Sequence, residues 1–111
     1  MLKLTVYIPE TALEPVKQAI FDAGAGRLGL YSDCSWQVLG TGQFRPLPGS
    51  HPFLGSQGQV EKVPEWRVEI LVQEECLVQV LEALHAHHPY EEPAYDVVEL
   101  RPVTVPGREI R

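Results

Sequence analysis

Four segments of the chain carry the pattern of extended backbone. Residues 2–8 alternate apolar and polar side chains, and residues 59–73 repeat this alternation over a longer run. Residues 35–44 and 94–100 are shorter segments of the same kind. Successive side chains of a strand point to opposite faces, so a period of two gives each strand one face suited to a core. We therefore expect four strands.

Two segments between these strands have apolar residues three to four positions apart, which predicts amphipathic helices over residues 12–23 and 74–87. Thr11 is a candidate N-cap of the first helix, and Gly24 suits the left-handed position that follows its end. Pro89 ends the second helix, because a residue before proline avoids the helical conformation. The residues expected to face inward are Leu13, Val16, Ile20 and Ala23 in the first helix and Leu77, Val78, Leu81 and Leu84 in the second.

The order of these elements predicts an α+β fold, the ferredoxin-like β-α-β-β-α-β sandwich, as a single domain over residues 1–111. A long loop at residues 46–58 and a C-terminal tail at residues 102–111 lie outside the regular elements, and residues 103–105 are a candidate edge or inter-subunit strand. The two helices would cover one face of the sheet. The other face would be open, and closed homo-oligomers commonly bury such a surface.

Charge and composition restrict the classes of partner that the chain is expected to bind. The chain has 111 residues, a net charge of -6 and a pI near 5.1, so its surface should repel the phosphates of nucleic acid. No apolar run is long enough to span a membrane, and the first residues do not resemble a signal peptide. Two cysteines do not form a disulfide framework, which favours a reducing cytoplasm. We expect a cytoplasmic protein without nucleic-acid or membrane partners.

Gly24, Gly26 and Gly29 match the spacing of a dinucleotide-binding motif. That motif must follow a strand and open a helix, so that the helix N-terminus meets the phosphates. Here it follows a helix and precedes a strand, which places helix carbonyl groups at the turn. The glycines therefore indicate a helix cap and a tight turn.

Gly40 and Gly42 precede a loop rich in glycine and proline, which allows two interpretations. The loop is a mobile hairpin tip, or its backbone amides bind a ligand. Cys34 lies near the preceding turn. A lone cysteine is more often a small apolar residue than a nucleophile, and no convincing catalytic triad can be assembled.

Histidine and glutamate residues gather after the second helix and suggest a divalent-metal site. The candidate ligands for a metal or a small molecule are His88, Glu91, Glu92, Glu65, Glu69 and His51. Each has an ordinary alternative: histidines near a helix C-terminus complement its dipole, and glutamates along a strand form a solvated face. An enzyme that uses these glutamates and His88 as acid and base is a further hypothesis, although a binding or assembly module fits the sequence better.

The spacing of several motifs resembles a known family. The first motif has glycines at 24, 26 and 29, followed by Tyr31, Cys34, Ser35 and Trp36. The second is a Gly-x-Gly-x-Phe-x-Pro motif at residues 40–46. Two further motifs are Glu-x-Arg-x-Glu at residues 65–69 and His-Pro-Tyr-Glu-Glu-Pro at residues 88–93. Together these motifs resemble the insert domain of the YqfO branch of the NGG1-interacting-factor-3-like family, which is similar to PII signalling proteins and to the divalent-cation-tolerance protein CutA. Proteins that consist of this domain alone are similar to the chain.

This resemblance implies a PII-like or CutA-like homotrimer that binds a small ligand or metal at clefts between subunits. The divalent-metal-binding protein and a scaffold without ligand are the alternatives. Metal chemistry and hydrolase-like activity belong to other domains of that family and do not transfer. The motif around Pro89, Tyr90 and Pro93 fits an architectural turn as well as a ligand site. PII proteins bind nucleotides beside their long loop, but residues 40–58 contain one basic residue, Arg45, which argues against polyphosphate.

Overall fold

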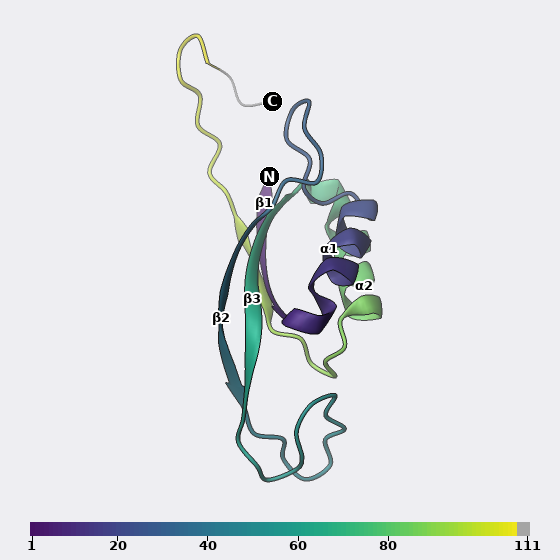
Figure 1. The fold of residues 1–111 in the computed structure, drawn as a ribbon. Coiled ribbons are helices and arrows are strands. Elements are labelled where there is room, and N and C mark those ends of the chain that lie inside the picture. Colours follow the sequence, from purple (N-terminus) through teal and green to yellow (C-terminus); the bar gives the residue numbers. More distant parts are fainter. Residues whose placement is uncertain (109–111) are drawn as a thin grey trace.

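The computed structural model describes residues 1–108 and shows an antiparallel sheet with two helices on one face (Figure 1). The strand order is β2-β3-β1-β4, with every neighbouring pair antiparallel. This confirms the predicted ferredoxin-like α+β fold. The elements are β1 (Leu2–Pro9), α1 (Leu13–Asp22), β2 (Trp36–Phe44), β3 (Glu61–Val72), α2 (Leu77–His87) and β4 (Tyr95–Glu99), with a short 3-10 turn before each helix.

The core lies between the helices and the two central strands. Alternate residues of β1 and β3 face the helices, and the register places Leu4 beside Ile70 and Val6 beside Val68. From the helices, α1 contributes Val16 and Ile20 and α2 contributes Val80 and Leu84, all fully buried. Removing such aliphatic side chains from water contributes about 1.5 to 3 kcal/mol each. This burial fixes the helix layer against one face of the sheet.

Two details of the predicted helices are wrong. Val78 is 70% exposed, whereas Val80, which was not expected to face inward, is fully buried. The true stripe begins at Leu77 and continues three, four and seven residues later, and Val78 lies about 100° around the helix from that start. Thr11 does not cap α1 either: it lies in the 3-10 turn Glu10–Ala12, and the residue at the cap position is Ala12.

The glycine motif after α1 forms the predicted cap and turn. Gly24 and Gly26 have φ values of 116° and 82°, a region that suits glycine. The Gly26 amide donates to the Leu71 carbonyl over 2.8 Å, and the Cys34 amide donates to Gly26 over 2.9 Å. A Cβ at Gly26 would lie 3.0 Å from the backbone of Cys34. The turn therefore joins the 24–35 loop to the end of β3.

Among residues 1–108, no helix covers the second face of the sheet (Figure 1). Trp36, Val38 and Val98 are among its exposed apolar residues. Glu69 lies between them and forms ion pairs with Lys3 at 3.1 Å and with Arg67 at 3.6 Å. The exposed apolar residues leave this face suited to contact with another chain.

The 46–58 loop and the C-terminal segment extend from opposite ends of the sheet (Figure 1). Within residues 102–108, an isolated bridge joins Val105 to Arg108, and residues 103–105 form no strand. Residues 109–111 of the predicted tail lie outside the described residues. The single domain over 1–111 and the inter-subunit strand remain predictions. Within residues 1–108, neither helix has the length and apolar composition needed to cross a bilayer.

Candidate functional site

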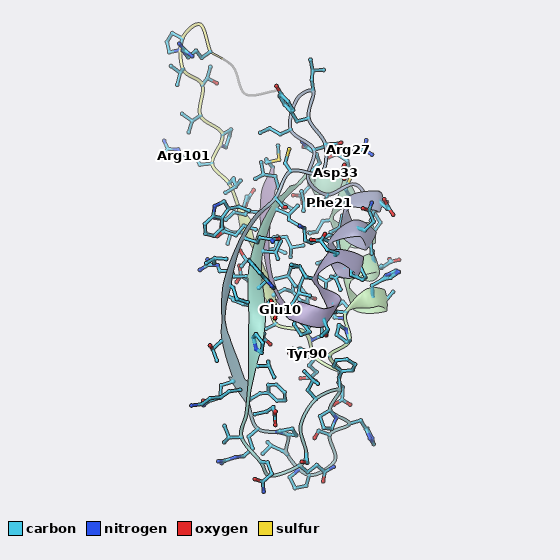
Figure 2. The ribbon with its side chains drawn as sticks, in the orientation of Figure 1. Glu10, Phe21, Arg27, Asp33, Tyr90 and Arg101 are labelled. Carbon is cyan, nitrogen blue, oxygen red and sulfur yellow. The ribbon has the colours of Figure 1, made fainter. Side chains whose placement is uncertain are left out.

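Tyr90 is the centre of a cluster formed by the segment between α2 and β4. Helix α2 ends at His87, and His88 is extended, with φ -70° and ψ 132°, as expected for a residue before proline. The chain then passes the end of β1, where the Tyr7 amide donates to the Ala94 carbonyl over 3.2 Å. Figure 2 shows Tyr90 below the helices, toward the end of the molecule from which the 46–58 loop extends.

His88 anchors the 88–94 segment to the end of β1. Its side chain is 6% exposed, and its Nε2 lies 2.8 Å from the Tyr7 carbonyl oxygen. The Tyr90 amide donates to Nδ1 over 3.1 Å. One neutral tautomer satisfies both bonds, because Nε2 then donates and Nδ1 accepts. Burial lowers the pKa of His88, which favours this neutral form, although the Tyr7 carbonyl and the Glu65 charge act in the opposite direction.

Glu65 on β3 fixes the other end of Tyr90. The Tyr90 hydroxyl donates to Glu65 Oε2 over 2.8 Å. Burial, and then the bond to Glu65, raise the pKa of Tyr90, so the phenol stays protonated. The Glu65 carboxylate lies over Gly42 of the neighbouring strand, in the space that a Cβ at that position would fill. The glycine therefore makes room for the carboxylate that holds the tyrosine.

The 46–58 loop has internal hydrogen bonds and is tied to the same segment. At its base the Gly58 amide donates to the Pro46 carbonyl over 2.7 Å, and within it the Ser50 amide donates to Leu47 over 3.1 Å. The His51 amide donates to Glu91 Oε1 over 3.1 Å, which joins the loop to the 88–94 segment. The loop is thus a structured wall beside Tyr90.

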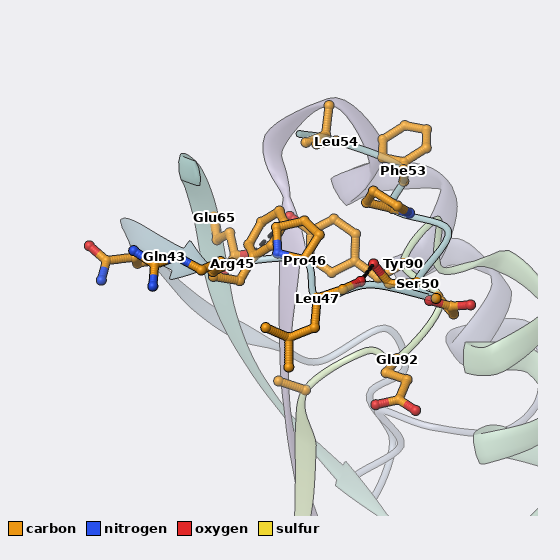
Figure 3. Close-up of a pocket in the computed structure, with 15 residues that line it drawn as sticks. Gln43, Arg45, Pro46, Leu47, Ser50, Phe53, Leu54, Glu65, Tyr90 and Glu92 are labelled. Atoms are coloured by element: carbon orange, nitrogen blue, oxygen red, sulfur yellow. Dashed lines mark hydrogen bonds between the residues drawn. The ribbon is translucent and has the colours of Figure 1, made fainter. Parts of the chain in front are cut away.

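Three aromatic rings and the loop line a solvent-open cavity of about 590 Å³, within the size range of small-molecule sites (Figure 3). The Tyr90 ring centroid lies 5.9 Å from that of Phe44 and 6.5 Å from that of Phe53, with tilted planes. His88 packs on the Tyr90 ring at 4.9 Å between centroids. The cavity thus has apolar, aromatic walls held by residues from β2, the loop and the 88–94 segment.

The charged residues around this cavity are mainly acidic. Glu65, Glu91 and Glu92 line it, against one cationic residue, Arg45. In Figure 3 the Arg45 side chain extends away from Tyr90 and Phe53. Glu65 and Glu91 each use one oxygen in the bonds described above, and the second oxygen of each has no partner among the described residues. The cavity therefore has acceptor groups and a negative potential.

The structure brings some predicted site residues together and separates others. Glu65, Glu91 and Glu92 share the cavity, while Glu69 is paired with Lys3 and Arg67 on the open face of the sheet. His51 approaches the site through its backbone amide. Among residues 1–108, no group of three or more histidine, cysteine, aspartate or glutamate residues is placed to hold a metal.

The motif residues mostly have architectural positions. Gly24, Gly26 and Gly29 have positive φ in the turn after α1, and Cys34 contributes its backbone to that turn. Pro89 and Pro93 bracket the segment that presents Tyr90. Sequence reasoning missed the aromatic partners: Phe44 was assigned to a strand, and Phe53 was not singled out within the 46–58 loop. The pair of large apolar residues Phe53 and Leu54, in a loop rich in glycine and proline, was the available signal.

Comparison with known proteins gives clear relatives, although no family model matches the chain. A Mycobacterium leprae protein named GTP cyclohydrolase 1 type 2 homolog is 49% identical over 100 residues, which are 90% of this chain and 26% of that protein. A Bacillus subtilis protein of the same name is 43% identical over 95 residues, 86% of this chain and 26% of that protein. The chain thus spans about a quarter of the length of the curated relatives it matches.

Comparison with solved structures gives the same relationship. A Bacillus cereus protein related to NIF3 superposes with a TM-score of 0.76 and 41% identity, over 89% of this chain and 25% of that one. CutA from Pyrococcus horikoshii superposes with a TM-score of 0.64 over 94% of this chain and 88% of that one, and its 16% identity shows a shared fold alone. The resemblance drawn from the sequence motifs is confirmed: the chain is homologous to one segment, about a quarter of the length, of NIF3-related proteins of the YqfO type, and that segment has the fold of CutA.

Proposed function

We propose that the chain forms a homotrimeric module that binds a small organic ligand beside the 46–58 loop, where a cleft between subunits extends the cavity around Tyr90. The observation that carries this proposal is the cavity itself, of about 590 Å³, with aromatic walls and acceptor groups. Its main residues, Glu65 and Tyr90, are already held by hydrogen bonds before any ligand arrives. Such a preorganised site loses little conformational entropy on binding.

The open face of the sheet supports assembly. Trp36, Val38 and Val98 expose apolar surface there, and β2 is an edge strand along its whole length. A second copy of the chain on this face would bury that surface and would protect the edge. Cys34 and Cys76 are free thiols, so a reducing cytoplasm remains part of the proposal.

Native mass spectrometry of freshly purified protein tests both the proposed trimer and the proposed ligand. A trimer with additional bound mass would support the function and would identify the ligand. A trimer without bound mass, unchanged after incubation with a metabolite extract, would favour a scaffold. The tip of the 24–35 loop favours that alternative, since Leu30 is 93% exposed and Tyr31 is also exposed. A monomer without bound mass would contradict the proposal.

Because residues 1–108 of one copy contain no group of three potential ligands, the divalent-metal alternative would use ligands from more than one copy. His88 has both ring nitrogens in hydrogen bonds within its own chain, so it would have to give up one of them to bind a metal. Glu91 and Glu92 are the remaining candidates near the cavity. Zinc or copper added to the trimer and measured in the same instrument tests this alternative, with a metal-free trimer as the contradicting result.

A further inference from the structure

Three aromatic rings and three carboxylates face one cavity, and this combination points to the charge of its ligand. We infer that the cavity beside Tyr90 binds an organic cation, an alkylated ammonium group that carries an apolar body. This inference rests on the proposed ligand-binding function and adds the chemical class of the ligand. The inference depends on three features of the cavity: the geometry of its aromatic rings, the charges around it and its mainly apolar wall.

The aromatic rings offer faces to a cation. Phe44 and Phe53 both lie near Tyr90, with planes tilted to it by 56° and 50°. Aromatic faces carry negative charge density, and a cation is attracted when it lies within about 6 Å of a ring centroid. With centroid separations of 5.9 and 6.5 Å, a cation can lie within that distance of Tyr90 and of either phenylalanine. Tilted, separated rings of this kind are how proteins recognise methylated ammonium groups.

The carboxylates supply the opposite charge. The Tyr90 hydroxyl keeps Glu65 at the edge of the rings, and the His51 amide keeps Glu91 at the loop. Each has a second oxygen that faces no partner among the described residues. Glu92 adds a third carboxylate to the lining. An ammonium group among the rings would lie in the field of all three, which strengthens binding where water is partly excluded.

Other ligand classes fit the cavity less well. A phosphate or carboxylate would meet three carboxylates and one guanidinium, Arg45, which points away from the rings. An inorganic divalent cation prefers a shell of oxygen or nitrogen donors, whereas most of this wall is carbon from residues such as Pro46, Leu47, Phe53 and Leu54. A neutral apolar molecule would leave the carboxylates without a partner. An organic cation would interact with both the aromatic rings and the carboxylates.

A matched pair of probes tests the inference. Choline and 3,3-dimethylbutan-1-ol have the same shape, but the alcohol has a carbon in place of the charged nitrogen. NMR titration of the full chain should show choline binding about tenfold tighter than the alcohol, a difference typical of partly desolvated cation–π contacts. Equal or weaker binding of choline would overturn the inference.

Two variants locate the site. Phe53→Leu removes one ring from an exposed loop, so folding should not change, and choline affinity should fall about fivefold. Tyr31→Leu removes an exposed ring from the 24–35 loop, which lies at the opposite end of the molecule (Figure 1), and should leave the affinity unchanged. Equal effects of the two variants would mean that choline binds elsewhere and would overturn the inference.

The outcomes also separate this inference from the proposed function. If choline does not bind, while native mass spectrometry finds a trimer that carries an anionic or neutral molecule, the proposed function stands and the cation inference is wrong. If the protein binds neither choline nor any molecule from a metabolite extract, both are wrong.

Discussion

His88 shows how one buried side chain can position the residues of a site through both of its ring nitrogens. Its two ring nitrogens connect the end of β1 to the backbone of Tyr90, and its ring supports the Tyr90 ring from behind. Histidine was predicted here as a metal ligand because histidine and glutamate were close in sequence. The sequence does not reveal that both nitrogens are used, since their partners are backbone atoms, one of them 81 residues away.

The pKa of His88 makes stability depend on pH in a defined direction. Burial lowers the folded-state pKa below 6.5, so the unfolded chain takes up a proton at higher pH than the folded chain does. The contribution of His88 is therefore complete above about pH 6.5 and is lost as the pH falls below that value toward the folded pKa. Urea unfolding at pH 7.5, 6.5 and 5.5 should show a steeper loss for the wild type than for His88→Gln. A His88 titration by NMR with a midpoint at or above 6.5 would disprove this.

At the level of elements, the pairing of β2 with β3 explains why two glycines lie in an edge strand. Gly40 pairs with Glu65 and Gly42 with Val63, so both glycines face the open side of the sheet with the Glu65 side chain. A Cβ at Gly42 would occupy the position of the Glu65 carboxylate, whereas a Cβ at Gly40 would meet one atom, 4.0 Å away. The two glycines therefore have different roles, although the sequence shows them as one Gly-x-Gly repeat.

Alanine at each glycine tests this difference. Gly42→Ala should displace Glu65 from Tyr90 and cost about 1.5 to 3 kcal/mol in the free energy of unfolding, as expected for a hydrogen bond to a charged group. Gly40→Ala should change it by less than about 0.5 kcal/mol. Tyr90→Phe removes the same bond, so its effect and that of Gly42→Ala should be less than additive in a double-mutant cycle measured by urea unfolding. Full additivity would show that Gly42 does not act through Glu65.

The second helix gives a matched comparison of exposed and buried valine. Val80→Ala should lower the free energy of unfolding by about 2 kcal/mol, because it removes buried apolar surface and leaves a cavity. Val78→Ala makes the same chemical change on the exposed face and should cost less than about 0.5 kcal/mol. Thermal or urea unfolding of both variants measures the difference. A larger loss for Val78→Ala would place the core face of α2 where the sequence pattern first suggested, and similar losses would contradict the exposed position of Val78.

For the whole molecule, the fold was predictable because its information is local. Alternation along residues 2–8 and 59–73 and the helical spacing of Leu13, Val16 and Ile20 each specify an element, and the order of elements then restricts the topology. The site depends instead on contacts between distant positions. Tyr90 meets Glu65 across 25 residues and His51 meets Glu91 across 40, and no periodic pattern encodes such pairs. The spacing of the sequence motifs identified several residues of the candidate site, but only the tertiary structure shows what each of them contacts.

Neighbouring residues on β2 allow the proposed trimer to be tested on one strand. Val38 is 44% exposed on the open face, opposite Arg67, and Leu39 is 47% exposed on the side of the helices. Val38→Glu places a carboxylate beside a guanidinium, so the monomer should fold, but a subunit packed on that face would bury the new charge. Leu39→Glu makes a similar change away from that face. Light scattering after size-exclusion chromatography should show monomers for Val38→Glu and trimers for Leu39→Glu, while circular dichroism confirms that both are folded. A trimeric Val38→Glu would exclude this face from the assembly, and the ligand site would then belong to each chain alone.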